Sequence, residues 1–420
     1  MSFQQGLSGL NSTNKNLEII GNNIANSNTF GAKVSRAEFA DVYAASLNGA
    51  GANSIGIGVN LAAVAQQFTQ GNITTTENPM DLAINGAGFF QVSDGRNPPT
   101  YTRNGQFKLD RDGFIVNNAK DKLMGYMADS NGIILPGKAV PLQVPTGGIA
   151  PQPTSRIDLE LNLDARLAVT APTAGNAIDY QDPRTFNNAT SLTVYDAKGQ
   201  DIAVTYYFQK AGDDTWNVFA TANGTSVAGT NAAPLPIQTI TYAADGSGPV
   251  TPPGTFTIDL PASVNAVGAN TLPITGLVLA FGGTTQYGSP YGVTNMQQDG
   301  FTAGLLTSVT VESSGMIMAR YSNGESKAAG QVELANFRNP QGLQSLGGNG
   351  WALTNTAGDP ILGTPSEGNL GILQAGALEE SNIDLTGELV HMITAQRTYQ
   401  ANAQTIKTMD QVLQTLVNLR

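Results

Sequence analysis

The stretch LTGELVHMITAQRTYQANAQTIKTMDQVLQTLVNLR, residues 385–420, decides how one end of the chain folds. Mostly apolar side chains recur in it with spacings of three and four, namely Leu385, Leu389, Met392, Gln396, Tyr399, Ala403, Ile406, Asp410, Leu413 and Val417. Such spacing places the stripe along one face of an α-helix that packs against a partner helix. At 1.5 Å per residue, the predicted helix is about 54 Å long.

A matching stripe lies in residues 1–30 and consists of Phe3, Leu7, Leu10, Asn14, Leu17, Gly21 and Ile24. Glycines in this helix each cost about 0.5–1 kcal/mol relative to alanine, so the helix depends on packing. We expect each end to pack first on the other end and then on the same ends of neighbouring copies. The alternative is a purely intramolecular core stripe. If the ends pack on neighbouring copies, we expect both of them to be disordered in the free monomer and helical in a polymer.

Composition narrows the class of protein. Of 420 residues, 13% are charged, about half the usual share. There are 48 glycines, no cysteines and a net charge of −11 without basic runs. Nucleic acid is therefore not expected as a partner, and disulfides and thiolate chemistry are excluded. We expect no Sec-type cleaved signal peptide at MSFQQGLSG and no membrane insertion, because no stretch approaches about 20 apolar residues.

The middle of the chain alternates short apolar runs with turn pairs and therefore predicts β-structure. Hairpin turns with a glycine at positive φ are expected at Asp94-Gly95, Asn104-Gly105, Asp112-Gly113, Asn131-Gly132 and Lys198-Gly199. In the bridge that follows the first helix, residues 37–47 are a short helix or an extended segment, 48–58 a loop and 59–68 a strand.

The predicted fold class is mainly β with terminal α-helices, in a nested multidomain architecture. Two β-domains, barrel-like or sandwich-like, accompany a helical coiled-coil region made by the two ends. The four predicted parts are a terminal helical core (1–30 with 385–420), a connecting segment (31–70 with 359–384), a discontinuous inner β-domain (71–145 with 285–358) and an inserted outer β-domain (146–284).

Candidate chemistry is sparse. The single histidine, His391, lies in the C-terminal helix without a second histidine or a cysteine, which favours a surface or contact role over catalysis or zinc binding. Asp110-Arg111-Asp112-Gly113 favours a hairpin turn over a calcium loop, which needs further oxygen ligands and a closing glutamate. Five aromatic residues favour packing over a sugar-binding face: Tyr101, Tyr206, Tyr207, Trp216 and Trp351. We expect no enzyme activity, no cofactor and no metal.

Several motifs in the same order resemble the bacterial flagellar rod and hook proteins. They are NNIANSNTFGAK (22–33), VSRAEFADVYA (34–44), NPMDLAINGAGFFQV (78–92), YTRNGQFKLDRDG (101–113) and LMGYMAD (123–129). The C-terminal stretch 376–420 resembles the end of a flagellar hook protein along its whole length.

This resemblance implies a structural subunit that assembles into the hook, a flexible curved tube that joins rod to filament as a universal joint. It implies an extracellular homopolymer, exported through the flagellar type III apparatus. The implied partners are the hook cap protein, the distal rod protein and the hook–filament junction proteins. Combined with the heptads, it implies this assembly interface: Leu7, Leu10, Leu17, Ile24, Leu385, Leu389, Met392, Tyr399, Ile406, Leu413 and Leu416.

Two other functions stay open at this point. One is the related distal rod protein, which normally lacks an inserted module as large as 146–284. The other is a secreted β-rich adhesin or glycan-binding protein.

Overall fold

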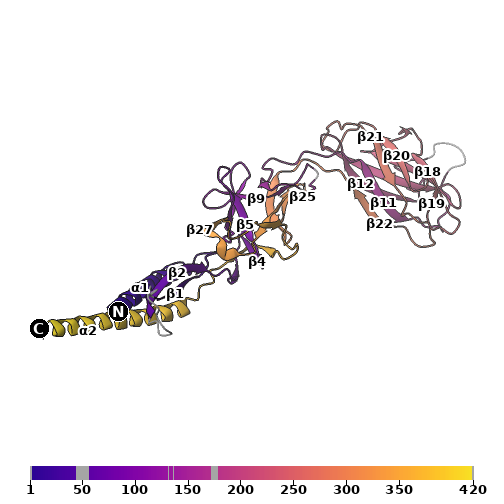
Figure 1. Cartoon of the computed structure of the whole chain (residues 1–420). Coiled ribbons are helices and arrows are strands. Elements are labelled where there is room, and N and C mark those ends of the chain that lie inside the picture. Colours follow the sequence, from indigo (N-terminus) through magenta and orange to yellow (C-terminus); the bar gives the residue numbers. More distant parts are fainter. Residues whose placement is uncertain (1, 44–55, 131, 136, 172–177, 419–420) are drawn as a thin grey trace. The chain divides into compact units, whose positions relative to one another are not determined.

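The chain forms two compact units in a computed structural model that describes residues 2–43, 56–130, 132–135, 137–171 and 178–418 (Figure 1). The first unit comprises Met1–Thr146, Ser308–Arg320 and Ser326–Arg420, and the second comprises Gly147–Thr307 and Tyr321–Glu325. The predicted fold class, mainly β with terminal helices, is confirmed. No helix in the described part of the chain is long and apolar enough to cross a membrane.

Helices α1 (Ser2–Ala25) and α2 (Leu385–Asn418) come from opposite ends of the chain and pack side by side in the first unit. They are antiparallel, because Gly6 faces Ile406 whereas Gly9 faces Asn402. Helix α2 continues past the start of α1, so its last turns have no cover from α1 (Figure 1).

An antiparallel hairpin of β1 (Ser35–Tyr43) and β2 (Gly56–Gln66) packs on α1. The segment predicted as either helix or extended chain is therefore a strand as far as Tyr43, and the predicted strand at 59–68 is confirmed. The predicted loop at 48–58 lies outside the described residues up to position 55, and its last three residues begin β2.

Most strands of the first unit join one sheet around the order β23-β24-β25-β9-β5-β6-β28-β27. Its members are β5 (Phe89–Ser93), β6 (Thr100–Thr102), β7 (Lys108–Leu109), β8 (Ile115–Val116), β9 (Lys122–Met127), β10 (Val140–Pro141), β23 (Leu306–Val311), β24 (Met316–Tyr321), β25 (Ser326–Val332), β26 (Leu334–Asn336), β27 (Gln344–Gly347), β28 (Gly350–Ala352) and β29 (Ile361–Gly363). An aromatic core of Phe89, Tyr101, Phe337 and Trp351 packs edge to face, and Phe68 beyond β2 joins it.

Two short antiparallel strand pairs join the segment before α2 to strands from the N-terminal part of the chain. Strand β3 (Ile73–Thr75) pairs with β31 (Ala377–Glu379), and β4 (Leu82–Asn85) pairs with β30 (Ile372–Ala375). Segments far apart in sequence thus lie side by side.

The second unit is a β-sandwich. One sheet has the order β20-β21-β11-β22 and the other β12-β13-β14-β18-β19. The strands are β11 (Arg156–Asn162), β12 (Asn188–Tyr195), β13 (Asp201–Lys210), β14 (Thr215–Ala222), β15 (Thr225–Ser226), β16 (Gly229–Thr230), β17 (Ala233–Pro234), β18 (Gln238–Tyr242), β19 (Pro249–Thr251), β20 (Thr255–Leu260), β21 (Ile274–Ala280) and β22 (Gly292–Gln298). Alternate residues of both sheets, such as Leu159 and Tyr206, form one shared core.

The boundary expected at residue 284 is too early. Strand β22 pairs with β11 along its whole length, and the second unit reaches Thr307. The Gly- and Pro-rich stretch that suggested a boundary is therefore a loop between two strands of the sandwich. The finer division of the first unit into a helical core, a connecting segment and an inner β-domain stays a prediction.

The predicted positive φ is confirmed at Gly95, Gly113, Gly132 and Gly199 but not at Gly105, and Asn131 lies outside the described residues. Gly113 (φ +84°) and Gly199 (φ +76°) adopt the left-handed conformation in the turns β7–β8 and β12–β13. Gly105 has no positive φ, contrary to prediction. A Cβ atom there would clash with the carbonyl oxygen of Leu82, so glycine is required for close approach of two backbone segments.

Candidate assembly surface

The contact between α1 and α2 is close because glycines of α1 face larger side chains of α2. We call it the helix seam, with Gly6, Gly9 and Thr13 on α1 and Ala395, Asn402 and Ile406 on α2. A Cβ atom added to Gly6 would lie 3.1 Å from Ile406 Cγ1, and one added to Gly9 would lie 2.9 Å from Asn402 Nδ2. Thr13 and Ala395 are buried. The N-terminal glycines therefore permit close packing, besides weakening the isolated helix.

The predicted stripe stays a prediction for contacts between copies, and its members differ in exposure within one copy. On α1 the seam is offset by one position from the predicted residues, so Leu7 keeps 45% of its surface exposed. Leu385, Leu389 and Tyr399 are also exposed, whereas Leu10, Leu17, Ile24, Met392 and Ile406 are half-buried. Leu413 and Leu416 belong to α2, but their side chains lie outside the described residues. Of the eleven predicted residues, only Ile406 is part of the seam as defined.

Further apolar side chains of α2 point to solvent. Val390 is 57% exposed and Ile393 52%, close to Leu385 and Leu389 along the helix, and Val412 is 52% exposed near the C-terminal end of α2. We call Leu385, Leu389, Val390 and Ile393 the α2 apolar face. Within one copy of the chain this face remains in water, which is unfavourable for four large aliphatic side chains.

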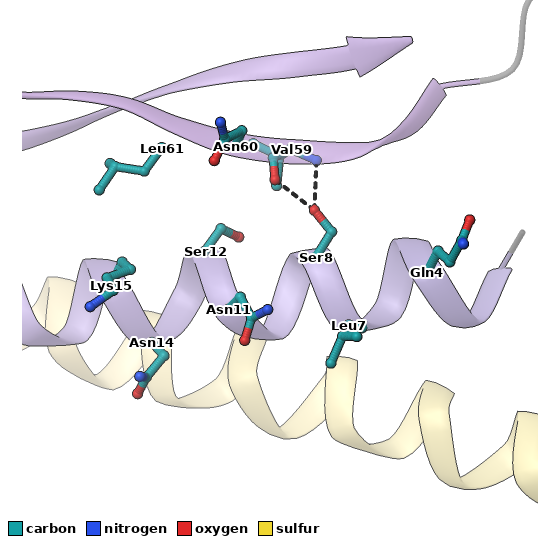
Figure 2. A pocket seen from close by; sticks show the side chains of 10 residues that line it. All are labelled: Gln4, Leu7, Ser8, Asn11, Ser12, Asn14, Lys15, Val59, Asn60 and Leu61. Atoms are coloured by element: carbon teal, nitrogen blue, oxygen red, sulfur yellow. Dashed lines mark hydrogen bonds between the residues drawn. The ribbon is translucent and has the colours of Figure 1, made fainter. Parts of the chain in front are cut away.

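The β1–β2 hairpin is fastened to α1 by hydrogen bonds. The Ser8 hydroxyl donates to the Val59 carbonyl oxygen at 2.6 Å and accepts from the Val59 N–H at 2.9 Å (Figure 2). Gln5 Nε2 donates to the Gly56 carbonyl at 2.6 Å. At the other end of α1, Asn23 exchanges two hydrogen bonds with the Ser35 backbone, at 2.8 and 3.0 Å. This hairpin is an intramolecular partner for α1 that the helical pattern could not reveal.

An open groove of about 560 Å³ lies between α1 and β2 (Figure 2). It is lined by Gln4, Leu7, Ser8, Asn11, Ser12, Asn14, Lys15, Val59, Asn60 and Leu61. Amide and hydroxyl groups dominate, with Leu7 and Leu61 as apolar contacts. Lys15 is paired with Glu18 at 2.8 Å, and both side chains are exposed. The groove has a weakly charged, adaptable lining rather than a set of converging catalytic groups.

The candidate chemical sites have structural explanations. His391 is 67% exposed with Nδ1 3.8 Å from Glu388 Oε1, and it borders a small hollow of about 260 Å³ between α1, β1 and α2. The Asp110 carboxylate accepts from the N–H groups of Asp112 and Phe114, which makes this segment the predicted hairpin turn. Within the described residues, no three His, Asp or Glu side chains are placed to hold a metal ion.

The aromatic residues weighed as a sugar-binding face lie mostly in cores. Tyr101 and Trp351 belong to the aromatic core of the first unit, and Tyr206 and Trp216 to the core of the sandwich. Tyr207 is half-buried and packs against Tyr180 at 4.9 Å between ring centroids. The packing prediction is confirmed for the four core residues.

Comparison with known proteins gives a consistent result along the chain. Family models match residues 3–33 (flagella basal body rod protein), 83–150 (flagellar hook protein FlgE/F/G D1 domain), 162–301 (flagellar basal body protein FlaE D2 domain) and 374–419 (flagellar basal body rod FlgEFG protein C-terminal). The D2 match lies inside the second unit.

Full-length relatives are also found. The chain is 39% identical to the flagellar hook protein FlgE of Salmonella typhimurium, with 100% of both chains covered. It is 32% identical to that of Treponema pallidum, with 100% of this chain and 99% of the relative covered. The crystal structure of Helicobacter pylori flagellar hook protein FlgE2 shares the fold, with a TM-score of 0.53 at 14% identity over 73% of this chain and 99% of that one.

Proposed function

This chain belongs to the flagellar hook protein family, and we propose that it is a structural subunit that self-assembles into the hook, a flexible curved tube that transmits torque from rod to filament. Full-length similarity to hook proteins of several bacteria supports this function. We also propose that the predicted interface stripe on both helices, with Leu7, Leu389 and Tyr399 among its members, forms contacts between copies.

The α2 apolar face is the observation that carries the proposal. One copy of the chain leaves about half the surface of Leu385, Leu389, Val390 and Ile393 in water, while the helix seam is occupied by other residues of α2, such as Asn402 and Ile406. A further helix from another copy would bury the rest of these side chains, and since about half of each is already covered, the gain is about half of the roughly 1.5–3 kcal/mol for full burial. Repeated in every subunit, such contacts make a stiff inner wall, which transmission of torque requires.

The second unit has a different role in this proposal. Its core is complete within the sandwich, so it does not need neighbours to fold. Its surface can therefore lie against neighbouring copies through wet, polar contacts that exchange at little cost as the tube bends. On this account, the four nested parts predicted from sequence correspond to layers of the tube. The helices lie at its inner radius, and the β-domains lie in successive outer layers.

The position of the protein in the flagellum implies specific partners. We propose that its polymer lies outside the cell between rod and filament. It would then meet the hook cap protein during assembly, the distal rod protein at its base and the hook–filament junction proteins at its tip. Its route would be the flagellar type III export apparatus.

The distal rod protein is the second candidate function. The large second unit favours the hook subunit, since the rod relative normally lacks an insertion of this size. For a glycan-binding protein, the aromatic residues in question would have to be available at the surface, and Tyr101, Tyr206, Trp216 and Trp351 are buried.

The proposed function is tested by polymerising purified chain and imaging the product by electron microscopy. The native chain should form tubes. Leu389→Asp with Ile393→Asp should abolish them, because charge in a helix contact costs several kcal/mol per subunit. Gln404→Glu adds one charge at an exposed polar position of α2 and should still form tubes. Normal tubes from the double variant would contradict the proposed role of the α2 apolar face.

A further inference from the structure

Three charged side chains meet in the interior of the first unit. Glu379, the last residue of β31, is buried, and its Oε1 lies 2.6 Å from Lys33 Nζ. Its Oε2 lies 3.0 Å from Arg103 Nη1. The side chains of Lys33 and Glu379 are 1% and 0% exposed, and that of Arg103 is 6% exposed. We call these three residues the ionic cluster.

Backbone groups complete the surroundings of the cluster. Lys33 Nζ also donates to the Thr69 carbonyl at 2.7 Å, and Arg103 Nη2 to the Gly86 carbonyl at 2.9 Å. The Gly71 N–H donates to Glu379 Oε1 at 2.9 Å. These partners come from separate parts of the chain, so all must be in place before the three charges can be buried together.

The charge balance within the cluster makes Glu379 the critical member. Two cations share one carboxylate, and burial lowers the pKa of both Lys33 and Arg103 despite the attraction of Glu379. Removal of Lys33 leaves a neutral pair. Removal of the Glu379 charge leaves two buried cations without a counter-charge, which is the most unfavourable arrangement of the set.

The cluster joins the chain's two ends. Lys33 follows α1, which ends at Ala25, whereas Glu379 precedes α2, which begins at Leu385. Two neighbouring hydrogen bonds also join the segment after α1 to the segment before α2. The Gly31 N–H donates to the Glu379 carbonyl at 2.8 Å, and the Val34 N–H to Asn382 Oδ1 at 2.8 Å.

The turn that carries Arg103 is part of the same assembly. Gly31 has φ +71°, and a Cβ atom on it would lie 2.6 Å from the backbone nitrogen of Asn104. The segment around Lys33 therefore packs directly on this turn. Both cations belong to the N-terminal part of the chain, whereas Glu379 belongs to the C-terminal part.

We propose that the ionic cluster is a conformational clasp, in which ordering of the segment around Lys33 and of the turn at Arg103 depends on docking of β31 through Glu379. A chain in which the C-terminal segment has not docked holds two cations that cannot be buried. Both helices are then tied to the β-structure of the first unit only when both ends of the chain are in place. The clasp acts within one copy, whatever the chain assembles into.

The test compares Glu379→Gln with Glu380→Gln in the full-length monomeric protein. Glu380 is the adjacent residue, and its carboxylate accepts only an exposed hydrogen bond of 3.3 Å from Asn72 among the contacts described. Hydrogen exchange is followed by mass spectrometry in peptides covering 27–36, 71–76 and 101–107, with β13 of the second unit as internal reference. Glu379→Gln should accelerate exchange in all three peptides together, on the order of tenfold or more, and leave β13 unchanged. Glu380→Gln should leave all four near native rates.

Lys33→Met separates charge balance from simple packing. If the clasp is correct, Lys33→Met should accelerate exchange less than Glu379→Gln does, because Arg103 keeps Glu379 as its counter-charge. Glu379→Gln could abolish protection throughout the first unit. In that case the double variant Lys33→Met/Glu379→Gln should regain part of the protection, because only Arg103 then remains charged and the cluster has the same net charge of one as in the native chain. Three results would each overturn the clasp: faster exchange confined to the residues around 379, equal effects of the two glutamate variants, or a double variant worse than either single one.

Discussion

Gly9 and Asn402 set the distance between α1 and α2: a Cβ atom on Gly9 would lie 2.9 Å from Asn402 Nδ2. The two helices also approach at Gly6, which faces Ile406, whereas the side chains of the α2 apolar face are exposed. The terminal helices thus form a tight pair and still offer apolar surface to other copies.

Gly9→Leu should separate the helices, whereas Gly21→Ala should stabilise α1. Overpacking costs about 1–3 kcal/mol, and a Cβ at Gly21 meets nothing within 4 Å, so alanine there gains about 0.5–1 kcal/mol of helix propensity. Hydrogen exchange of α1 and α2 amides measures both. Greater protection in Gly9→Leu than in the native chain would show that the helices do not approach at this residue.

Ser8→Ala should loosen the β1–β2 hairpin. The substitution removes both hydrogen bonds to Val59, each worth about 0.5–1.5 kcal/mol. Ser12→Ala is the matched control, because the Ser12 hydroxyl donates within its own helix, to Gly9. Exchange of the Val59 amide reports the loss. Equal rates in the two variants would mean that Ser8 does not hold the hairpin.

Two tyrosines of the sandwich should respond differently to replacement by phenylalanine. The Tyr206 hydroxyl is buried without a hydrogen-bond partner among the described residues, while Tyr242 donates to Thr284 Oγ1 at 3.0 Å. Tyr206→Phe should leave the free energy of unfolding of the second unit unchanged or raise it, and Tyr242→Phe should lower it by about 1 kcal/mol. Chemical denaturation followed by Trp216 fluorescence measures both, and the reverse order would contradict the assignment of these bonds.

Alkaline pH should destabilise the second unit. Burial raises the pKa of Tyr242 to about 12, although its bond to Thr284 acts in the opposite direction. A tyrosine in the unfolded chain titrates near pH 10, so the unfolded state loses its proton first. The stabilisation is fully present below about pH 10 and is lost as pH rises towards 12. Denaturant unfolding at pH 9 to 11.5 should show a steeper decline for the native chain than for Tyr242→Phe.

The sequence predicts the helices and many strands well, because these elements depend on the periodicity of apolar side chains. Heptad spacing identifies α2 from Leu385, and alternation with turn residues identifies β12 and β13 around Gly199. Both signals are local and repeat over many residues.

Contacts between distant segments could not be predicted in this way. The heptad stripe does not single out Gly6 and Gly9, where the close approach of α1 to α2 depends on small size rather than on hydrophobicity. The pairing of Lys33 with Glu379 leaves no periodic signal, since it joins single residues from opposite ends of the chain. The boundary near residue 284 was misjudged because a glycine-rich loop inside the sandwich resembles a linker.

The central claim is that the terminal helices assemble copies of this chain into a tube with their apolar side chains buried between subunits. Helical reconstruction by electron cryomicroscopy of the polymerised native chain tests it most directly. The account predicts α1 and α2 at the inner radius, with Leu389 and Ile393 in contact with a helix of another copy and the second unit at the outer radius. A tube in which the helices lie outermost, or in which the α2 apolar face remains in water, would contradict it.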